Sequence, residues 1–140
     1  MRYLGLDLGT TTLGIAITDK TNTLVTPLKL IKFKSEDYES LLGELNNIID
    51  ENHITDIVLG LPKNMDNSLG FAAERSIKFK ELLQKEGINV HLEDERLTTV
   101  EALNILKNNG NKNIKKKEKT DVLSAVLILE SYLKRNKNEK

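Results

Sequence analysis

The chain has 140 residues, a length that fits one compact domain with a hydrophobic core. Its 21 basic and 21 acidic residues cancel, which excludes a strongly basic nucleic-acid-binding protein but allows a local basic patch. The absence of cysteine excludes disulfide bonds and thiolate metal sites. No apolar run predicts a membrane span or a signal peptide, and we expect a cytoplasmic protein.

The first 33 residues predict three consecutive strands. Alternating leucine and isoleucine residues mark the first two strands, and a turn at residues 9–12 joins them. The third strand lies within residues 24–33, and Pro27 favours a position at the edge of the sheet because proline lacks an N–H. Asp7 interrupts the apolar pattern of the first strand. A lone carboxylate there needs a partner, such as a metal ion, an arginine or several backbone N–H groups.

From residue 35 onwards, helical and extended patterns alternate. We expect first a helix capped by Ser35, then a buried strand over residues 54–61 and a loop over 62–70. A helix over about 69–86 and a strand over 88–95 follow. The chain then predicts a helix over about 98–108 and a last helix that begins at Thr120 or Asp121. This order predicts an α/β fold, a mixed five-stranded sheet with the first strand in the centre and helices on both faces. We expect a single domain over residues 1–136, a frayed end from Lys134 and a flexible tail over 137–140.

Acidic residues follow the ends of the strands that we expect to be parallel. Asp7 ends the first strand, Glu93, Asp94 and Glu95 end the fifth, and Asp121 lies in the first turn of the last helix. In open α/β sheets such ends share one edge, where ligands bind. Carboxylates without histidine or cysteine suit Mg²⁺ or Mn²⁺.

Two questions about these acids stay open. Alternation does not decide which acid of residues 93–95 points inward, and Asp121 also fits an ordinary acid that complements the helix dipole. For His53 and His91 we expect structural or surface roles, because neither has a second histidine at a ligand spacing.

Several residues could contact phosphate. Gly9 and Thr10 offer N–H and hydroxyl groups beside Asp7, and Lys63 and Arg96 are candidates on the same edge. Residues 112–119 carry five lysines and one glutamate, and they form either a solvated loop or a flexible arm on a nucleic-acid backbone. In that run, Lys115, Lys116 and Lys117 are the candidate substrate contacts. Arg75 fits a solvated helix face, and the six Phe and Tyr residues are too dispersed to predict a base-stacking platform.

Five segments together resemble one known family. They are Gly-Leu-Asp-Leu-Gly-Thr from Gly5, Leu-Gly-Ile-Ala-Ile-Thr-Asp from Leu13, Gly-Leu-Pro-Lys-Asn-Met from Gly60, Asp-Glu-Arg-Leu-Thr-Thr from Asp94 and Lys-Thr-Asp-Val-Leu-Ser-Ala from Lys119. Their order and spacing are similar to those of the YqgF/RuvX family, which is described as Holliday junction resolvases and pre-16S rRNA nucleases of the RNase H-like superfamily.

The resemblance implies an RNase H-like fold and cleavage of phosphodiester bonds that depends on a divalent metal. It assigns the catalytic and metal-binding acids to Asp7, Glu95 and Asp121. The implied partner is nucleic acid, either precursor rRNA or branched DNA, and the implied assembly is a monomer or weak homodimer.

Two alternatives remain at this point. Thr11 and Thr12 stand where the family usually has a Lys-Arg pair, which leaves open a non-catalytic nucleic-acid-binding or ribosome-assembly module. The opening segment also looks like the first phosphate loop of actin-like ATPases and sugar kinases. Those proteins need a second lobe and an adenosine-binding segment, for which 140 residues leave too little room.

Overall fold

A five-stranded sheet in the order β3-β2-β1-β4-β5 forms the centre of the protein. The computed structural model describes residues 2–35, 37–62, 70–94 and 116–138. The elements are β1 (Tyr3–Leu8), β2 (Thr12–Thr18), β3 (Val25–Lys32), α1 (Tyr38–Asn52), β4 (Asp56–Leu61), α2 (Phe71–Lys85), β5 (Asn89–Asp94) and α4 (Lys116–Asn138). The helix that we expect over 98–108 and most of the loop over 62–70 lie outside the described residues.

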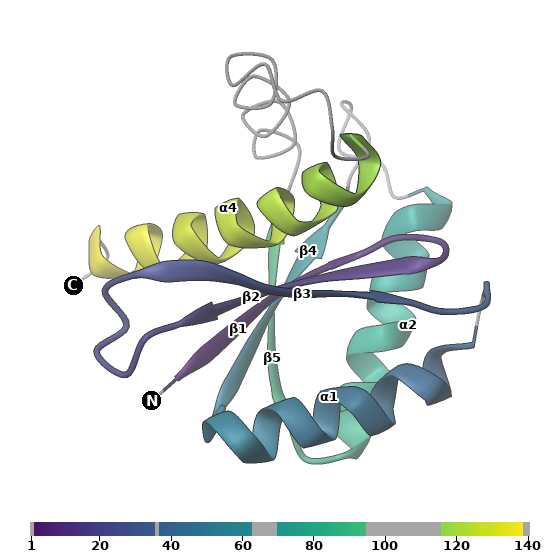
Figure 1. Cartoon of the computed structure of the whole chain (residues 1–140), viewed down its shortest axis with the longest axis horizontal. Coiled ribbons are helices and arrows are strands. Elements are labelled where there is room, and N and C mark those ends of the chain that lie inside the picture. The colour runs from purple at the N-terminus through teal and green to yellow at the C-terminus, as the bar shows by residue number, and fades with distance from the viewer. Residues whose placement is uncertain (1, 36, 63–69, 95–115, 139–140) are drawn as a thin grey trace.

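The strand directions confirm the mixed sheet that the sequence predicts. β1 is central, antiparallel to β2 and parallel to β4, and β4 is parallel to β5. Figure 1 shows the strands crossing the middle of the molecule at different angles, as in a twisted sheet. The carboxyl ends of β1, β4 and β5 therefore lie at one edge of the sheet.

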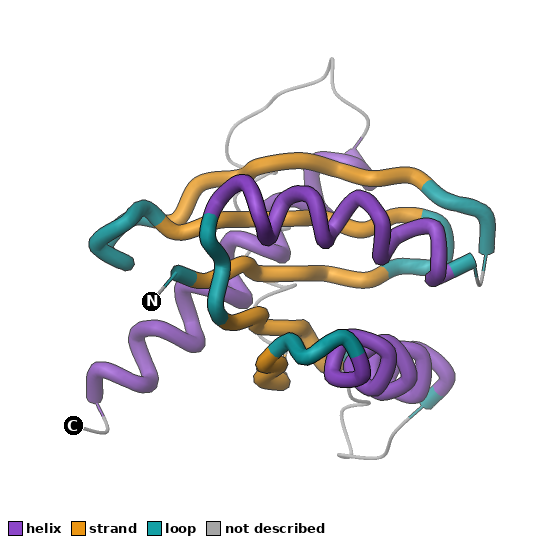
Figure 2. The backbone as a smooth tube through the Cα atoms, turned by 90° about the horizontal axis from the view of Figure 1, so that it is seen from below, coloured by secondary structure: helices purple, strands orange, loops and turns teal. Residues whose placement is uncertain are grey.

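Helices cover both faces of the sheet (Figures 1 and 2). On one face, Leu4, Leu6 and Leu8 of β1 join a core that includes Leu41 and Leu45 of α1 and Phe79 and Leu83 of α2. On the other face, Ala125, Ile128, Leu129 and Tyr132 of α4 pack with Ala16 and Val58. Successive strand residues point to opposite faces, so Asp7 lies on the α4 side.

β3 forms one edge of the sheet, as Pro27 predicts. Its register against β2 shifts between Ile15 and Ala16, which pair with Lys29 and Pro27 and leave Leu28 as an extra residue. This β-bulge and the proline both interrupt the regular ladder at the edge. β2 and β4, which each lie between two other strands, are buried along their whole lengths.

The structure corrects the predicted start of α1. The helix begins at Tyr38, and Asp37 rather than Ser35 occupies the N-cap position. The Asp37 N–H donates to the carbonyl of Lys34 (2.9 Å), so Ser35 lies inside a turn before the helix. The Tyr38 ring packs 6.0 Å from the rings of both Phe33 and Phe79, which ties the first helical turn to the core.

The structure also corrects both ends of the last helix. α4 begins at Lys116, before the predicted start at Thr120 or Asp121, and it continues to Asn138, beyond the frayed end that we expect from Lys134. Lysine and glutamate are favourable helix formers, so a run rich in them extends a helix at little cost. Part of the predicted basic arm is therefore the first turn of α4.

Candidate functional site

Asp7 lies near the carboxyl end of the central strand and is half-buried. Its register partner in β2 is Gly14. In β4, Leu59 pairs with Leu6, so Gly60 follows at the level of Asp7. Neither neighbouring strand therefore presents a side chain at the level of this carboxylate.

A tight turn follows Asp7. The Gly9 N–H donates to the carbonyl of Thr12 (2.7 Å), and a Cβ on Gly9 would lie only 3.0 Å from Thr12 Oγ1. The Phe33 N–H donates to the carbonyl of Thr11 (2.9 Å), which anchors the turn to the end of β3. Thr10 and Thr11 are exposed, so the hydroxyl groups that the sequence suggests for phosphate contact are accessible.

α4 runs antiparallel to β1 across the Asp7 side of the sheet. The Tyr132 ring contacts Tyr3 with 6.0 Å between ring centroids. Two residues further along β1, a Cβ on Gly5 would meet the Ala125 carbonyl oxygen and Leu129 Cβ, each at 2.7 Å. The contacts therefore move toward the amino end of α4 as β1 advances toward Asp7.

Glu93 is a buried acid whose role the sequence does not reveal. Its side chain is 5% exposed and lies under α4. Ser131 Oγ donates to Glu93 Oε2 (2.7 Å), and Arg135 Nη2 forms an ion pair with Oε1 without hydrogen-bond geometry. Of the three consecutive acids at residues 93–95, Glu93 thus holds α4 on the sheet. The serine and arginine four residues apart on α4 are too common a pattern to have predicted this contact.

The other predicted site residues are described only in part. Lys63, Glu95, Arg96 and Lys115 lie outside the described residues. The backbones of Lys116, Lys117 and Asp121 belong to α4, and Asp121 precedes Ala125 by one helical turn. In the described parts of the chain, no three His, Cys, Asp or Glu side chains gather into a possible metal site. Of the three predicted acids, Asp7 is therefore the one whose side chain the structure describes.

A second polar cluster lies at the opposite edge, where β4 and β5 begin. His91 Nε2 is 3.0 Å from Asp56 Oδ1, and the His91 ring packs 5.2 Å from the Tyr132 ring. Thr55 Oγ1 donates to Asp56 Oδ2 (2.7 Å). Burial first, and then the nearby Asp56 carboxylate and Tyr132, raise the pKa of Tyr3 above its ordinary value of 10.0. Of the structural or surface roles that we expect for His91, these contacts favour the structural one.

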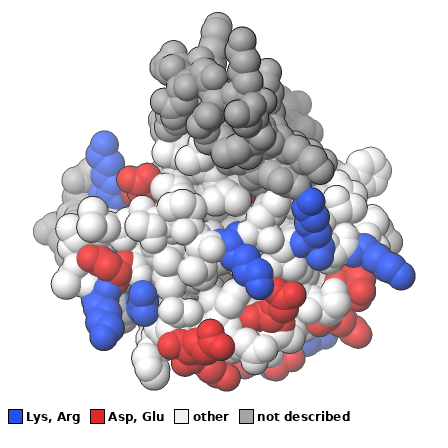
Figure 3. Space-filling model, viewed as in Figure 1, with Lys and Arg blue, Asp and Glu red and all other residues white. Residues whose placement is uncertain are grey.

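Basic and acidic side chains are interspersed on the described part of the face in Figure 3. This described part of the surface therefore carries no extended patch of one charge. None of the described helices is long and apolar enough to cross a membrane.

Comparisons with known sequences agree on one family. A family model described as "RuvX: Holliday junction resolvase" matches residues 1–135. A protein of Leuconostoc mesenteroides named "Putative pre-16S rRNA nuclease" is 40% identical over 135 residues, which cover 95% of this chain and 94% of that protein. A protein of Lactobacillus gasseri with the same name is 38% identical over 143 residues, and the alignment covers 100% of both chains.

Solved structures support the fold. RuvC of T. thermophilus, in complex with a Holliday junction substrate, aligns with a TM-score of 0.59 at 14% identity and covers 96% of both chains. The Holliday junction resolvase of fowlpox virus aligns with a TM-score of 0.61 at 16% identity and covers 96% of this chain and 99% of that one. The α/β fold with its mixed sheet is thus of the RuvC and RNase H type.

Proposed function

Because the chain belongs to the RuvX family, we propose that it is a nuclease that hydrolyses phosphodiester bonds of nucleic acid with Mg²⁺ or Mn²⁺. The observation that carries this proposal is the position of Asp7. Its carboxylate lies at the carboxyl end of the central strand, with glycines at the same level on both neighbouring strands and an exposed Gly-Thr turn beside it. Ligand sites in open α/β sheets occupy this edge.

Asp7, Glu95 and Asp121 would hold the metal ions. The progression of contacts between α4 and β1 supports the inclusion of Asp121, since one helical turn beyond Ala125 corresponds to two further residues along β1. Glu95 comes two positions after Glu93, the spacing of residues on one face of an extended strand. Three carboxylates without histidine form a hard, oxygen-only ligand set that suits Mg²⁺ or Mn²⁺.

When bound, such ions activate a water molecule and stabilise the leaving oxygen of the phosphodiester. The chain itself would orient the substrate. The Gly9 N–H is bonded to the Thr12 carbonyl, so Gly9 would shape the turn, and the exposed Thr10 would offer its hydroxyl group to a phosphate next to Asp7. Lys63 and Arg96 would contact neighbouring phosphates. The lysines at 115–117 would add salt-sensitive affinity without reading the base sequence.

The names of the relatives favour precursor rRNA as the substrate, and branched DNA is the second candidate. We further propose that the protein acts in the cytoplasm as a monomer or weak homodimer. The two substrates demand different assemblies, because resolving a four-way junction takes two cuts made in concert, whereas trimming an RNA end takes one.

A cleavage panel tests the proposal. Purified protein is incubated with precursor rRNA or a four-way DNA junction in Mg²⁺, in Mn²⁺ or with a chelator, beside Asp7→Asn and the control Asp50→Asn, an exposed carboxylate on α1. We expect metal-dependent cleavage by the wild type and by Asp50→Asn, and binding without cleavage by Asp7→Asn. Intact substrates under every metal condition, with binding that survives Asp7→Asn, would instead support the non-catalytic binding module.

A further inference from the structure

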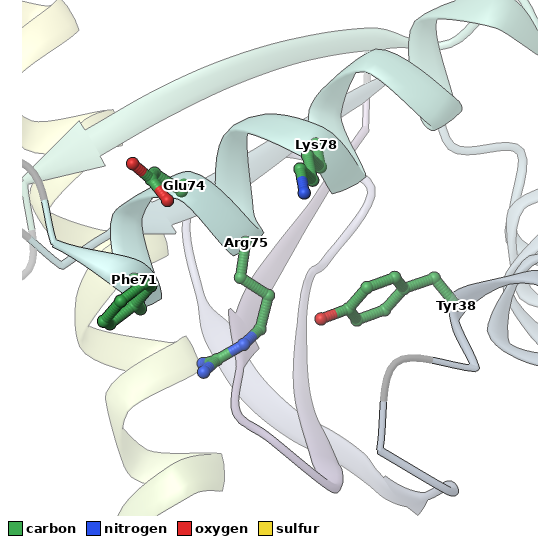
Figure 4. A pocket seen from close by; sticks show the side chains of 5 residues that line it. All are labelled: Tyr38, Phe71, Glu74, Arg75 and Lys78. Atoms are coloured by element: carbon green, nitrogen blue, oxygen red, sulfur yellow. The ribbon is translucent and has the colours of Figure 1, made fainter.

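A hollow of about 360 Å³ lies between the amino end of α2 and the start of α1. Tyr38, Phe71, Glu74, Arg75 and Lys78 line it. In Figure 4, Arg75 extends between Phe71 and Tyr38, and the Tyr38 hydroxyl points toward Arg75. Two aromatic residues that are 33 positions apart in the sequence thus border one hollow, although their spacing does not predict a stacking platform.

Phe71 is the most exposed large apolar side chain in the described part of the chain, at 87%. It is the first residue of α2, and Ala73, Ser76 and Phe79 on the same helix face the interior. A single exposed apolar residue is common on protein surfaces, so Phe71 indicates binding only together with the aromatic and cationic residues that line the same hollow. Tyr38, by contrast, is held by Phe33 and Phe79 and forms a rigid wall of the hollow.

Two cations lie on the same side of α2 as Phe71. Arg75 and Lys78 follow it by four and seven residues, a spacing that places all three on one helical stripe. Within the ranges that the structure describes, neither cation forms an ion pair with a carboxylate. Arg75 is half-buried against the hollow, in contrast to the solvated position that the sequence suggests. Glu74 opposes the two cations, but it points away from Tyr38 in Figure 4.

The hollow lies at the same edge of the molecule as the candidate active site. α2 follows β4, and the carboxyl ends of the parallel strands β4 and β1 lie side by side. In Figures 1 and 2, the amino end of α2 and the turn between β1 and β2 lie toward the same side. Asp7 lies on the α4 face of the sheet and the hollow on the face covered by α1 and α2, so a nucleic-acid strand bound at both would pass over the carboxyl ends of β1 and β4.

We propose that Phe71, Tyr38, Arg75 and Lys78 form a binding site for unpaired nucleotides of an RNA substrate, at the same end of the sheet as the cleavage site. This inference rests on the proposed nuclease function. An aromatic face stacks on any unpaired base, and the cations bind the adjacent phosphates. Paired bases in a duplex do not present their faces for such stacking, so the site favours single-stranded over double-stranded segments.

Binding of a fluorescent single-stranded RNA oligonucleotide, measured by anisotropy in an Asp7→Asn background, tests the site. We expect Phe71→Ala to weaken binding roughly tenfold and Phe71→Tyr to preserve it, because stacking needs an aromatic ring. Arg75→Gln and Lys78→Gln should each lower the slope of log affinity against log salt by about 0.7. Lys85→Gln is the matched control, since Lys85 is an exposed cation at the far end of α2.

Different results would contradict the proposed binding site and the proposed nuclease function. Unchanged RNA binding by Phe71→Ala, in a protein whose wild type cleaves RNA, overturns the site and leaves the nuclease proposal standing. RNA binding that depends on Phe71, in a wild type that cleaves no substrate, supports the site and overturns the nuclease proposal. Equal losses for Phe71→Ala on single-stranded and duplex RNA would contradict the selectivity for unpaired nucleotides.

Discussion

The carbonyl oxygen of Ala125 in α4 lies 2.7 Å from the position that a Cβ on Gly5 of β1 would occupy. Leu129 Cβ lies at the same distance from that position. Both contacts involve atoms that cannot rotate away, so α4 approaches β1 this closely only above a glycine. Gly5 therefore sets the height of α4 over the strand that carries Asp7.

Gly5→Ala should displace α4 and lower both stability and activity. Overpacking of this kind costs about 1–3 kcal/mol, which a shift in the urea unfolding midpoint measures. If the height of α4 positions Asp121, cleavage should fall further than the folded fraction does. Gly43→Ala is the control, because Gly43 lies inside α1 with nothing within 4 Å of its Cβ position. This control should gain about 0.5–1 kcal/mol, and an equal loss in both variants would contradict the proposed role of Gly5.

Removing the Arg135 charge should cost more stability than removing the Glu93 charge. Arg135→Gln leaves a buried carboxylate without its ion-pair partner, whereas Glu93→Gln leaves Arg135, which is 53% exposed and can be hydrated. We expect losses of about 1–3 kcal/mol for Arg135→Gln and about 1 kcal/mol for Glu93→Gln. The double variant should be more stable than Arg135→Gln alone. Chemical denaturation measures all three, and strict additivity would rule out the coupling.

Glu93 and Glu95 should respond differently to the same substitution. Glu95→Gln removes a proposed metal ligand, so we expect cleavage to be lost while the unfolding midpoint stays near the wild-type value. Glu93→Gln removes a contact between the sheet and α4, so we expect a lower midpoint and residual cleavage. Parallel cleavage and denaturation measurements separate the two outcomes, and the reverse pattern would assign the metal to Glu93.

The hydrogen bonds of Asp19 predict that the stability of the turn between β2 and β3 depends on pH. Its carboxylate accepts hydrogen bonds from the Thr23 N–H (2.8 Å), the Thr21 hydroxyl (2.9 Å) and the Leu24 N–H (3.2 Å). These bonds, that of Thr23 first, lower the pKa of Asp19 below its ordinary value of 3.8. The ionised Asp19 carboxylate therefore stabilises the folded state fully above about pH 4, and this stabilisation is lost as the pH falls through the pKa of Asp19 in the folded protein.

Asp19→Asn should lower the urea midpoint at pH 7, and its difference from the wild type should shrink as the pH falls below 3.8. Thr21→Ala removes one donor and should show a smaller loss with the same pH trend. A difference between wild type and Asp19→Asn that is constant from pH 7 to pH 3 would show that the charge of Asp19 does not stabilise the turn.

The strands were predictable because their signal is local. Alternation of Leu4, Leu6 and Leu8 defines β1, and Pro27 indicates an edge strand, so the sheet and its central strand follow from the sequence. The starts of α1 and α4 were not predictable. Tertiary contacts decide the start of α1, and a lysine-rich run such as the one before Thr120 fits a solvated loop as well as a helix. Tyr38 begins α1 through its packing on Phe33 and Phe79, residues that propensity does not connect.

The candidate site was predictable only as far as residue types allow. Asp7 was identified because a carboxylate among apolar residues is unusual, and the turn beside it has the expected exposed threonine at Thr10. The engagement of Glu93 by α4 depends on how a helix 38 residues away crosses the sheet. The hollow beside Phe71 likewise depends on how α1 and α2 lie relative to each other, and no pattern in the sequence predicts that arrangement.

The irregular edge of the sheet restricts how two copies of the protein can meet. A second chain that extended the sheet beyond β3 would have to pair with a strand containing Pro27 and a bulge at Leu28, where regular ladder bonds fail. Continuous strand-to-strand dimerisation across β3 is therefore disfavoured, and so is fibre-like stacking along that edge. Any pair of copies that cuts two strands in concert must use another surface, and the distance between its two cuts will be set there.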